Sequence, residues 1–153
     1  MNSKTISLVA IALWVITISI IAFLFTKGKT ETAADGRTAV ILSSKEKILV
    51  LSEMRMMLGS VHGILEGLDA DDMSKVESAA LSGGTKMMID LDPAFMMKLP
   101  VAFKQQGVGA HTKFDSIAQA AKSGKNKNEL LKMLKDQMAS CVQCHAAYQL
   151  KEE

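Results

Sequence analysis

The first apolar segment of the chain is residues 6–25, ISLVAIALWVITISIIAFLF, which holds no charged residue. As a helix it would run about 30 Å, the thickness of a bilayer core. Lys4 precedes it, and Lys27 and Lys29 follow it. A cleaved signal peptide has a shorter apolar region followed directly by small residues, and here small residues come only later, at Thr32-Ala33-Ala34. We therefore expect residues 1–26 to be an uncleaved transmembrane anchor, with a cleaved signal peptide as the alternative.

The next segment, residues 27–38, is polar and small and contains glycine. This composition is typical of a short linker between structured parts. We expect a tether over residues 27–38 and one folded domain over residues 39–153.

Beyond Ala39 the apolar residues recur at helical spacing. Over residues 40–68 they step by three or four positions and predict one buried helix face. That face holds Leu51, Met54, Leu58, Val61, Leu65 and Leu68.

Three further helices and one short helical segment are expected downstream. Asp69 or Asp71 can cap a second helix that weakens at Gly83-Gly84, and Met87–Ile89 can extend it. Asp92-Pro93 opens a short helical segment that ends at Leu99-Pro100. A third helix covers residues 101–122, with one apolar face formed by Phe103, Gly107, Ala110, Phe114, Ile117 and Ala121. Asn126 or Asn128 can cap a fourth helix, whose apolar positions are Leu130 or Leu131, Leu134, Met138, Cys141, His145 and Tyr148.

No strand signal accompanies these helices. Four amphipathic helices with short connections predict an all-α fold, an antiparallel four-helix bundle behind an N-terminal transmembrane helix. The chain is 48% hydrophobic, which argues against intrinsic disorder. A net charge of only +2 argues against a nucleic-acid-binding protein. No set of residues typical of an enzyme active site stands out, so we do not expect an enzyme.

Chemistry is concentrated at Cys141-Val142-Gln143-Cys144-His145. C-x-x-C-H is the attachment signature of c-type haem. On a helix the two thiols lie about one turn apart and can reach the two vinyl groups of one porphyrin, while His145 lies one turn beyond Cys141 and can ligate the iron. The alternatives are a redox dithiol, which usually begins a helix after a strand, and a zinc site, which needs a fourth ligand from His62 or His111. A disulfide between Cys141 and Cys144 within one helix would be strained. We predict one covalent haem c.

The chain resembles the cytochrome c′ family, the class II, four-helix-bundle c-type cytochromes. The resemblance rests on SCVQCHAAY, Ser140 to Tyr148, near the C-terminus, on the stretch from Phe103-Lys104-Gln105 to Phe114 and Ile117, and on the basic tail after Tyr148. It covers roughly residues 40–150. The membrane anchor is a departure, since most members of the family are soluble.

The resemblance implies a haem held against the first and fourth helices of the bundle. In this family a Met of the first helix ligates the iron, or an apolar residue blocks that side. Met54 is our candidate ligand, with Met57, a histidine or no protein ligand as alternatives. We expect Met56 to point outward, and His62 and His111 to be exposed or hydrogen-bonded. Arg55, which follows Met54, could pair with a haem propionate.

These residues predict a membrane-anchored cytochrome that transfers electrons through a haem ligated by His145 and Met54. The alternative is a cytochrome c′ that binds NO or CO at an open or weakly held sixth position. The expected partners are membrane-associated redox proteins, and a homodimer is possible on family grounds. Covalent haem attachment takes place outside the bacterial cytoplasmic membrane, so we expect a single-pass inner-membrane protein with its haem domain in the periplasm.

Overall fold

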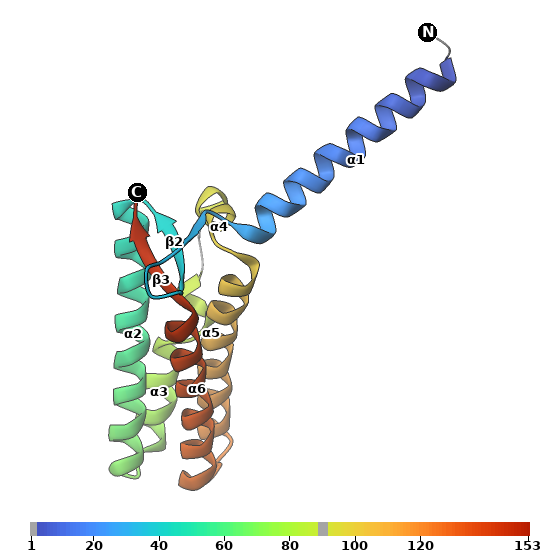
Figure 1. Cartoon of the computed structure of the whole chain (residues 1–153). Coiled ribbons are helices and arrows are strands. Elements are labelled where there is room, and N and C mark those ends of the chain that lie inside the picture. The colour runs from blue at the N-terminus through green and yellow to red at the C-terminus, as the bar shows by residue number, and fades with distance from the viewer. Residues whose placement is uncertain (1–2, 89–91) are drawn as a thin grey trace.

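The computed structural model describes residues 3–88 and 92–153. Within these residues the chain is mostly helical, with six α-helices and one three-stranded sheet. Figure 1 shows four helices, α2, α3, α5 and α6, side by side along the long axis of a body from which α1 projects. The sheet lies at the end of the body where α1 joins it, and we call this the sheet end.

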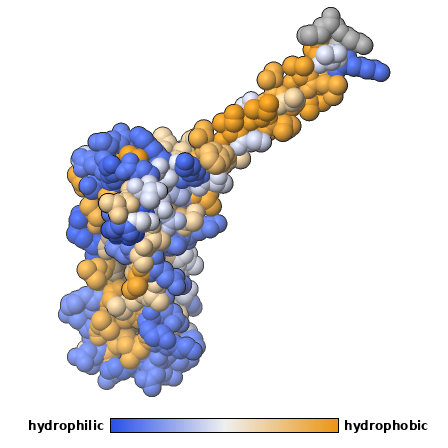
Figure 2. Space-filling model, viewed as in Figure 1, coloured by the Kyte–Doolittle hydropathy of each residue, from blue (hydrophilic) through white to orange (hydrophobic). Residues whose placement is uncertain are grey.

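Helix α1 spans Ser3–Lys27, and none of its described residues is buried. It is long enough and apolar enough to cross a membrane. Its surface is apolar over most of its length, as Figure 2 shows. The predicted N-terminal apolar helix is therefore present.

The predicted tether is wrong, because residues 27–38 contribute to a sheet. Strand β1, Thr30–Thr32, forms an antiparallel hairpin with β2, Thr38–Leu42. Strand β2 also pairs in parallel with β3, Tyr148–Glu152, with Thr38 opposite Tyr148 and Leu42 opposite Glu152. The expectation of a chain without strands is wrong for the same reason. The strands are short, and the partner that stabilises β2 lies at the other end of the chain.

Helix α2 spans Ser44–Asp69 and begins at a capping box formed by Ser43 and Glu46. Its predicted buried face is only partly right. Val61 and Leu68 are buried, but the other fully buried apolar residues are Val50 and Ile64, and Leu51, Leu58 and Leu65 are exposed. Apolar residues occur on two faces of this helix, and the packing against α3 selects the face that carries Ile64.

Between α2 and α5 the chain forms two short helices and one turn of 3₁₀ helix. Helix α3, Met73–Ser82, is capped by Asp72, one position after the predicted Asp71, and ends at Gly83. The 3₁₀ turn spans Thr85–Met88, and the predicted extension to Ile89 lies outside the described residues. Helix α4, Pro93–Lys98, is capped by Asp92 as predicted.

The last two long helices follow the predicted boundaries closely. Helix α5 spans Val101–Lys122, and its predicted face is confirmed by the burial of Phe103, Ala110, Phe114, Ile117 and Ala121. Helix α6 spans Lys127–Ala147 behind a capping box of Asn126 and Glu129. Leu130 and Leu134 are buried as predicted, but Met138 is exposed and Gln137 is buried. Tyr148, predicted as helical, is the first residue of β3.

The body has two apolar cores. The loop-end core lies toward the α5–α6 loop and centres on Ile64, Val76, Phe114, Ile117, Leu130 and Leu134. The sheet-end core is smaller and consists of Val40, Leu42, Val50, Phe95, Leu99 and Phe103. Met54, Cys144 and Tyr148 pack against the sheet-end core, so the cysteine motif belongs to this half of the molecule.

Candidate functional site

The C-x-x-C-H motif occupies the last two turns of α6. Cys141 and Cys144 are both free thiols and both half-buried, whereas His145 is exposed. The Cys141 thiol donates to the Gln137 carbonyl oxygen at 3.6 Å. Burial raises the pKa of the Cys141 thiol, and burial together with the neighbouring Cys141 raises that of Cys144. Burial thus favours the neutral thiol form of both cysteines.

Three adjoining cavities surround the motif, and Met54 and His145 line all of them. The first, of about 180 Å³, lies between α6, α2 and the sheet and also contacts Arg37, Phe103 and Tyr148. The second, of about 100 Å³, lies among α2, α5 and α6. The third, of about 370 Å³, lies between α2 and α6. Residues of α6 and α2 that are far apart in the sequence thus face the same space.

This space is apolar and lies where the helix packing is incomplete. Helix α2 packs on α3, α3 on α5 and α5 on α6, but α2 and α6 make few direct contacts. Leu58 and Val142 line the third cavity and are 69% and 68% exposed. Figure 2 shows apolar surface on this side of the body. An open, apolar groove with two thiols and an imidazole along one wall fits a large planar apolar group such as haem.

The three methionines of α2 take different positions around the groove. Met54 lines all three cavities, whereas Met57 lines the second and third only. Met57 packs against the loop-end core, and Met54 packs against the sheet-end core beside Cys144. Met56 is 48% exposed and points outward, as predicted. Of these three methionines, only Met54 lines all three cavities together with His145.

The two other histidines have the surroundings we predicted for them. The His62 side chain is 73% exposed and lies 3.5 Å from Glu66. His111 is buried, and its Nδ1 donates to the Gly83 carbonyl oxygen at 2.7 Å. His111 also lines the second cavity together with Glu53, and burial raises the pKa of the Glu53 carboxyl. Within residues 3–88 and 92–153, no three His, Cys, Asp or Glu side chains are grouped to hold a metal ion.

Sequence reasoning missed Arg37, which it assigned to the tether. Arg37 Nη1 donates to the carbonyl oxygens of His145, at 3.2 Å, and Tyr148, at 3.3 Å. Its Nη2 donates to Gln149 Oε1 at 2.9 Å, and its Nε pairs with Asp35 at 2.8 Å. The hydrogen bonds from Arg37 hold the pKa of the Asp35 carboxyl below its usual value. Arg37 therefore joins the β1–β2 hairpin to the backbone of the cysteine motif.

Arg55, the arginine that we predicted near the site, is exposed and lines only the third cavity. Arg37 lines the first cavity. Arg37 lies in the turn between β1 and β2, outside the residues 39–153 that we expected to form the folded domain. The sequence carried one signal for Arg37, its place in Asp35-Gly36-Arg37, since Asp-Gly pairs favour tight hairpin turns.

Comparisons with known proteins identify no relative of the chain. No family model, no curated protein and no solved structure matches the chain.

Proposed function

We propose that the chain is a membrane-anchored, mono-haem c-type cytochrome on an antiparallel four-helix bundle, and that it transfers electrons. The single observation that carries this proposal is the position of Met54. It comes from α2, opposite the C-x-x-C-H motif on α6, and lines every cavity that His145 lines. A methionine and a histidine are the residues that could together ligate the iron of an electron-transfer haem.

The residues that would hold the haem are Cys141 and Cys144, through two thioether bonds, with His145 and Met54 as axial ligands. The haem supplies an iron that gains and loses one electron. The chain contributes an apolar environment and a thioether ligand, both of which raise the reduction potential relative to a solvated haem. Leu58, Val61 and Val142 line the groove with apolar side chains.

The backbone around His145 is held from outside the helix. The Arg37 guanidinium binds the His145 and Tyr148 carbonyl oxygens, and β3 then continues into the sheet. These contacts hold the last turn of α6, which carries His145 and would present its imidazole to the proposed haem.

Helix α1 completes the proposal as a single transmembrane anchor in the inner membrane, with the body in the periplasm and Met1–Lys4 on the cytoplasmic side. The lysines on both sides of α1 do not decide this orientation. It follows from the proposed haem, because covalent attachment takes place outside the cytoplasmic membrane. The partners would be membrane-associated redox proteins.

The experiment is expression of the full chain in a host that matures cytochromes c, followed by mass spectrometry under denaturing conditions. One haem should remain attached, and Cys141→Ser with Cys144→Ser should abolish the attachment. Acid and organic solvent that extract all the haem would contradict covalent attachment. A ferrous spectrum that carbon monoxide leaves unchanged would support ligation by Met54.

A second candidate function is gas binding at an open sixth position, and polar groups in the second cavity favour it. Gln106 and His111 line this cavity with Met54, and Gln106 Oε1 has no hydrogen-bond partner in the described part of the chain. The side-chain amide N–H of Gln106 could donate a hydrogen bond to a small diatomic ligand, whereas its oxygen can only accept one. This candidate predicts a high-spin ferrous spectrum that carbon monoxide changes at once.

A further inference from the structure

The junction between α1 and the body is a close backbone contact. Gly28 has φ +65°, and a Cβ at this position would lie 2.5 Å from the Lys98 carbonyl oxygen and 2.6 Å from the Pro100 nitrogen. Only glycine tolerates both the conformation and the approach. The Lys29 amide donates to the same Lys98 oxygen at 2.7 Å. Helix α1 therefore meets the body without a flexible segment.

A second contact lies one turn further into α1. The Lys104 ammonium of α5 lies 3.8 Å from the centre of the Phe25 ring and donates to the Met96 carbonyl oxygen at 3.2 Å. A cation over an aromatic ring is attracted to the electron-rich face of the ring. Helix α1 is thus held at its base against both α4 and α5, and the angle between α1 and the body is set by packing.

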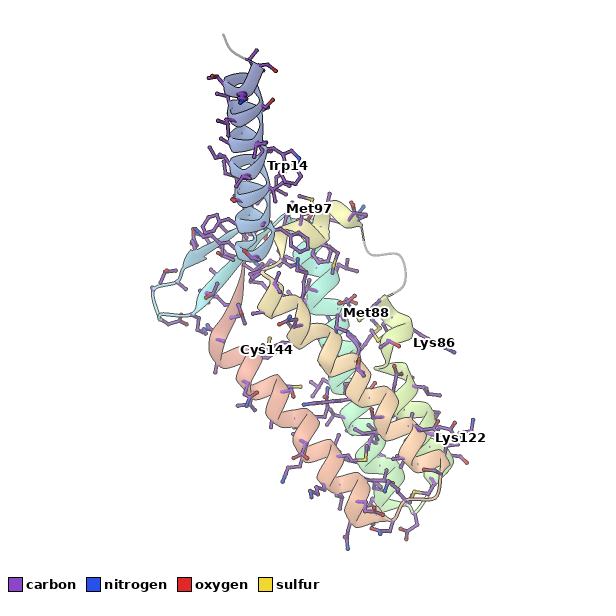
Figure 3. All side chains as sticks on the ribbon, turned by 90° about the vertical axis from the view of Figure 1, so that its right-hand side faces the viewer. Trp14, Lys86, Met88, Met97, Lys122 and Cys144 are labelled. Carbon is purple, nitrogen blue, oxygen red and sulfur yellow. The ribbon has the colours of Figure 1, made fainter. Side chains whose placement is uncertain are left out.

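The surface around the base of α1 combines apolar side chains with lysines. Met97 on α4 is 57% exposed, and Figure 3 shows it beside the base of α1. Lys27 lies at the end of α1 with its ammonium 5.8 Å from the centre of the Phe23 ring. Exposed apolar groups next to lysines with long aliphatic stems are typical of surfaces at the boundary between water and lipid.

We propose that α4 and the first turn of α5 form a lipid-contact face, which lies in the phospholipid headgroup layer of the bilayer that α1 spans. Met97 contacts the boundary between headgroups and acyl chains, and the ammonium groups of Lys27 and Lys104 lie at the level of the phosphates. This inference rests on the proposed membrane anchor and is independent of the haem. Because α1 packs on α5, the groove between α2 and α6 stays uncovered and open to a partner protein.

The test is photocrosslinking of the full-length protein in nanodiscs of phosphatidylethanolamine and phosphatidylglycerol that contain a phospholipid with a diazirine near its headgroup. Crosslinked peptides are identified by mass spectrometry after proteolysis. We expect crosslinks in α1 and in residues 93–104. Peptides around Lys122, at the opposite end of the body in Figure 3, should carry none.

The outcomes separate the two proposals. Crosslinks confined to α1 would overturn the lipid-contact face and leave the anchor intact. Equal crosslinking around Met97 and Lys122 would also overturn the face, since it would indicate a mobile body. Absence of crosslinks in α1 would overturn the anchor and the face together. The visible spectrum of the same sample reports on the haem independently.

A matched pair of variants sharpens the test. Met97→Asp places a charge on the proposed face and should lower crosslinking of residues 93–104 several-fold, while crosslinking of α1 stays unchanged. Met56→Asp introduces the same charge at a methionine of similar exposure on α2 and should leave the pattern unchanged. An unchanged pattern for Met97→Asp would contradict the proposed position of α4 in the headgroup layer.

Discussion

The four helices of the body pack more completely at the loop end than at the sheet end. At the loop end, Phe114, Ile117, Leu130 and Leu134 are almost fully buried and fill the space between the helices. At the sheet end, α2 and α6 leave cavities, and a three-stranded sheet ties the chain together. The largest of these cavities is open to solvent and is lined by the exposed apolar side chains of Leu58 and Val142. The loop end is thus the more completely packed of the two, and the sheet end keeps the open groove in which we propose that a haem is held.

The largest expected effect comes from the same substitution at the two ends. Phe114→Ala removes a fully buried ring and should lower the free energy of unfolding by about 4 kcal/mol. Phe103 borders two of the groove cavities and contacts Tyr148 edge to face at 5.2 Å. Phe103→Ala should cost about 2 kcal/mol, because less packing is lost. Chemical denaturation of both variants measures the difference.

The visible spectrum of the proposed haem is a second measurement on the Phe114→Ala and Phe103→Ala variants. Phe103→Ala should change it, and Phe114→Ala should not. If Phe114→Ala alters the spectrum while Phe103→Ala does not, the assignment of the two ends to stability and cofactor binding is wrong.

Met54→Ala is expected to affect the sheet end alone. Loss of the side chain should cost about 2 kcal/mol of stability, at the low end for a methionine that is only partly buried. It should also convert a low-spin haem to one that binds carbon monoxide, and it should lower the reduction potential. Spectroscopy and redox titration check both effects. Met56→Ala is the control, and conversion by Met57→Ala alone would identify Met57 as the ligand.

Arg37→Ala should loosen the link between the hairpin and α6. The guanidinium makes charge-assisted hydrogen bonds to His145, Tyr148 and Gln149 at a partly exposed position, so we expect a loss of about 1 to 2 kcal/mol. Hydrogen exchange should become faster in β3 and in the last turn of α6. Arg55→Ala, at an exposed position, should leave exchange in these segments unchanged.

The smallest expected effect is a pH dependence at the sheet end. The Lys98 ammonium, 2.9 Å from Glu46, together with the backbone amide and hydroxyl of Ser43, lowers the pKa of the Glu46 carboxyl from its ordinary 4.5 to about 2. Because this pKa is depressed in the folded protein, the stabilisation is complete above about pH 4.5 and is lost as the pH falls through about 2.

Glu46→Gln should therefore cost about 1 kcal/mol at pH 7 and clearly less near pH 2, as unfolding curves at both values would show. The loop-end comparison is Glu77→Gln, which removes a 3.7 Å pair with the more exposed Lys122 and should change little at either pH. Equal pH dependence of the two variants would contradict the role of the Glu46–Lys98 pair.

The sequence predicts the helices well because their signals are local. Asp92-Pro93 before α4 and the capping box of Asn126 and Glu129 before α6 satisfy the first amide groups of the helix that follows. The face of α5 is also predicted correctly, because most of its large apolar residues occupy one side, Val108 being the exposed exception. The cysteine motif is readable for the same reason, since all of its groups lie within five consecutive positions.

The remaining features depend on contacts between distant residues. Strand β2 is too short to be recognised without β3, and Arg37 gains its role only through the carbonyl oxygens of His145 and Tyr148. The buried face of α2 is ambiguous in the sequence, because Leu51, Leu58 and Leu65 are as apolar as the residues that are buried. These leucines are exposed because α6 does not pack closely against that side of α2.

The parallel pairing of β2 with β3 has a consequence for the order of folding. Arg37 and Gln149, which meet across this pair, lie 112 positions apart in the chain. Contacts of such separation form late, because a long loop must be closed before they contribute. Strand β3 should therefore join the sheet after α6 has formed. Because Tyr148 and Leu150 of β3 line a cavity together with Cys144, the proposed haem attachment would be easiest before β3 pairs with β2.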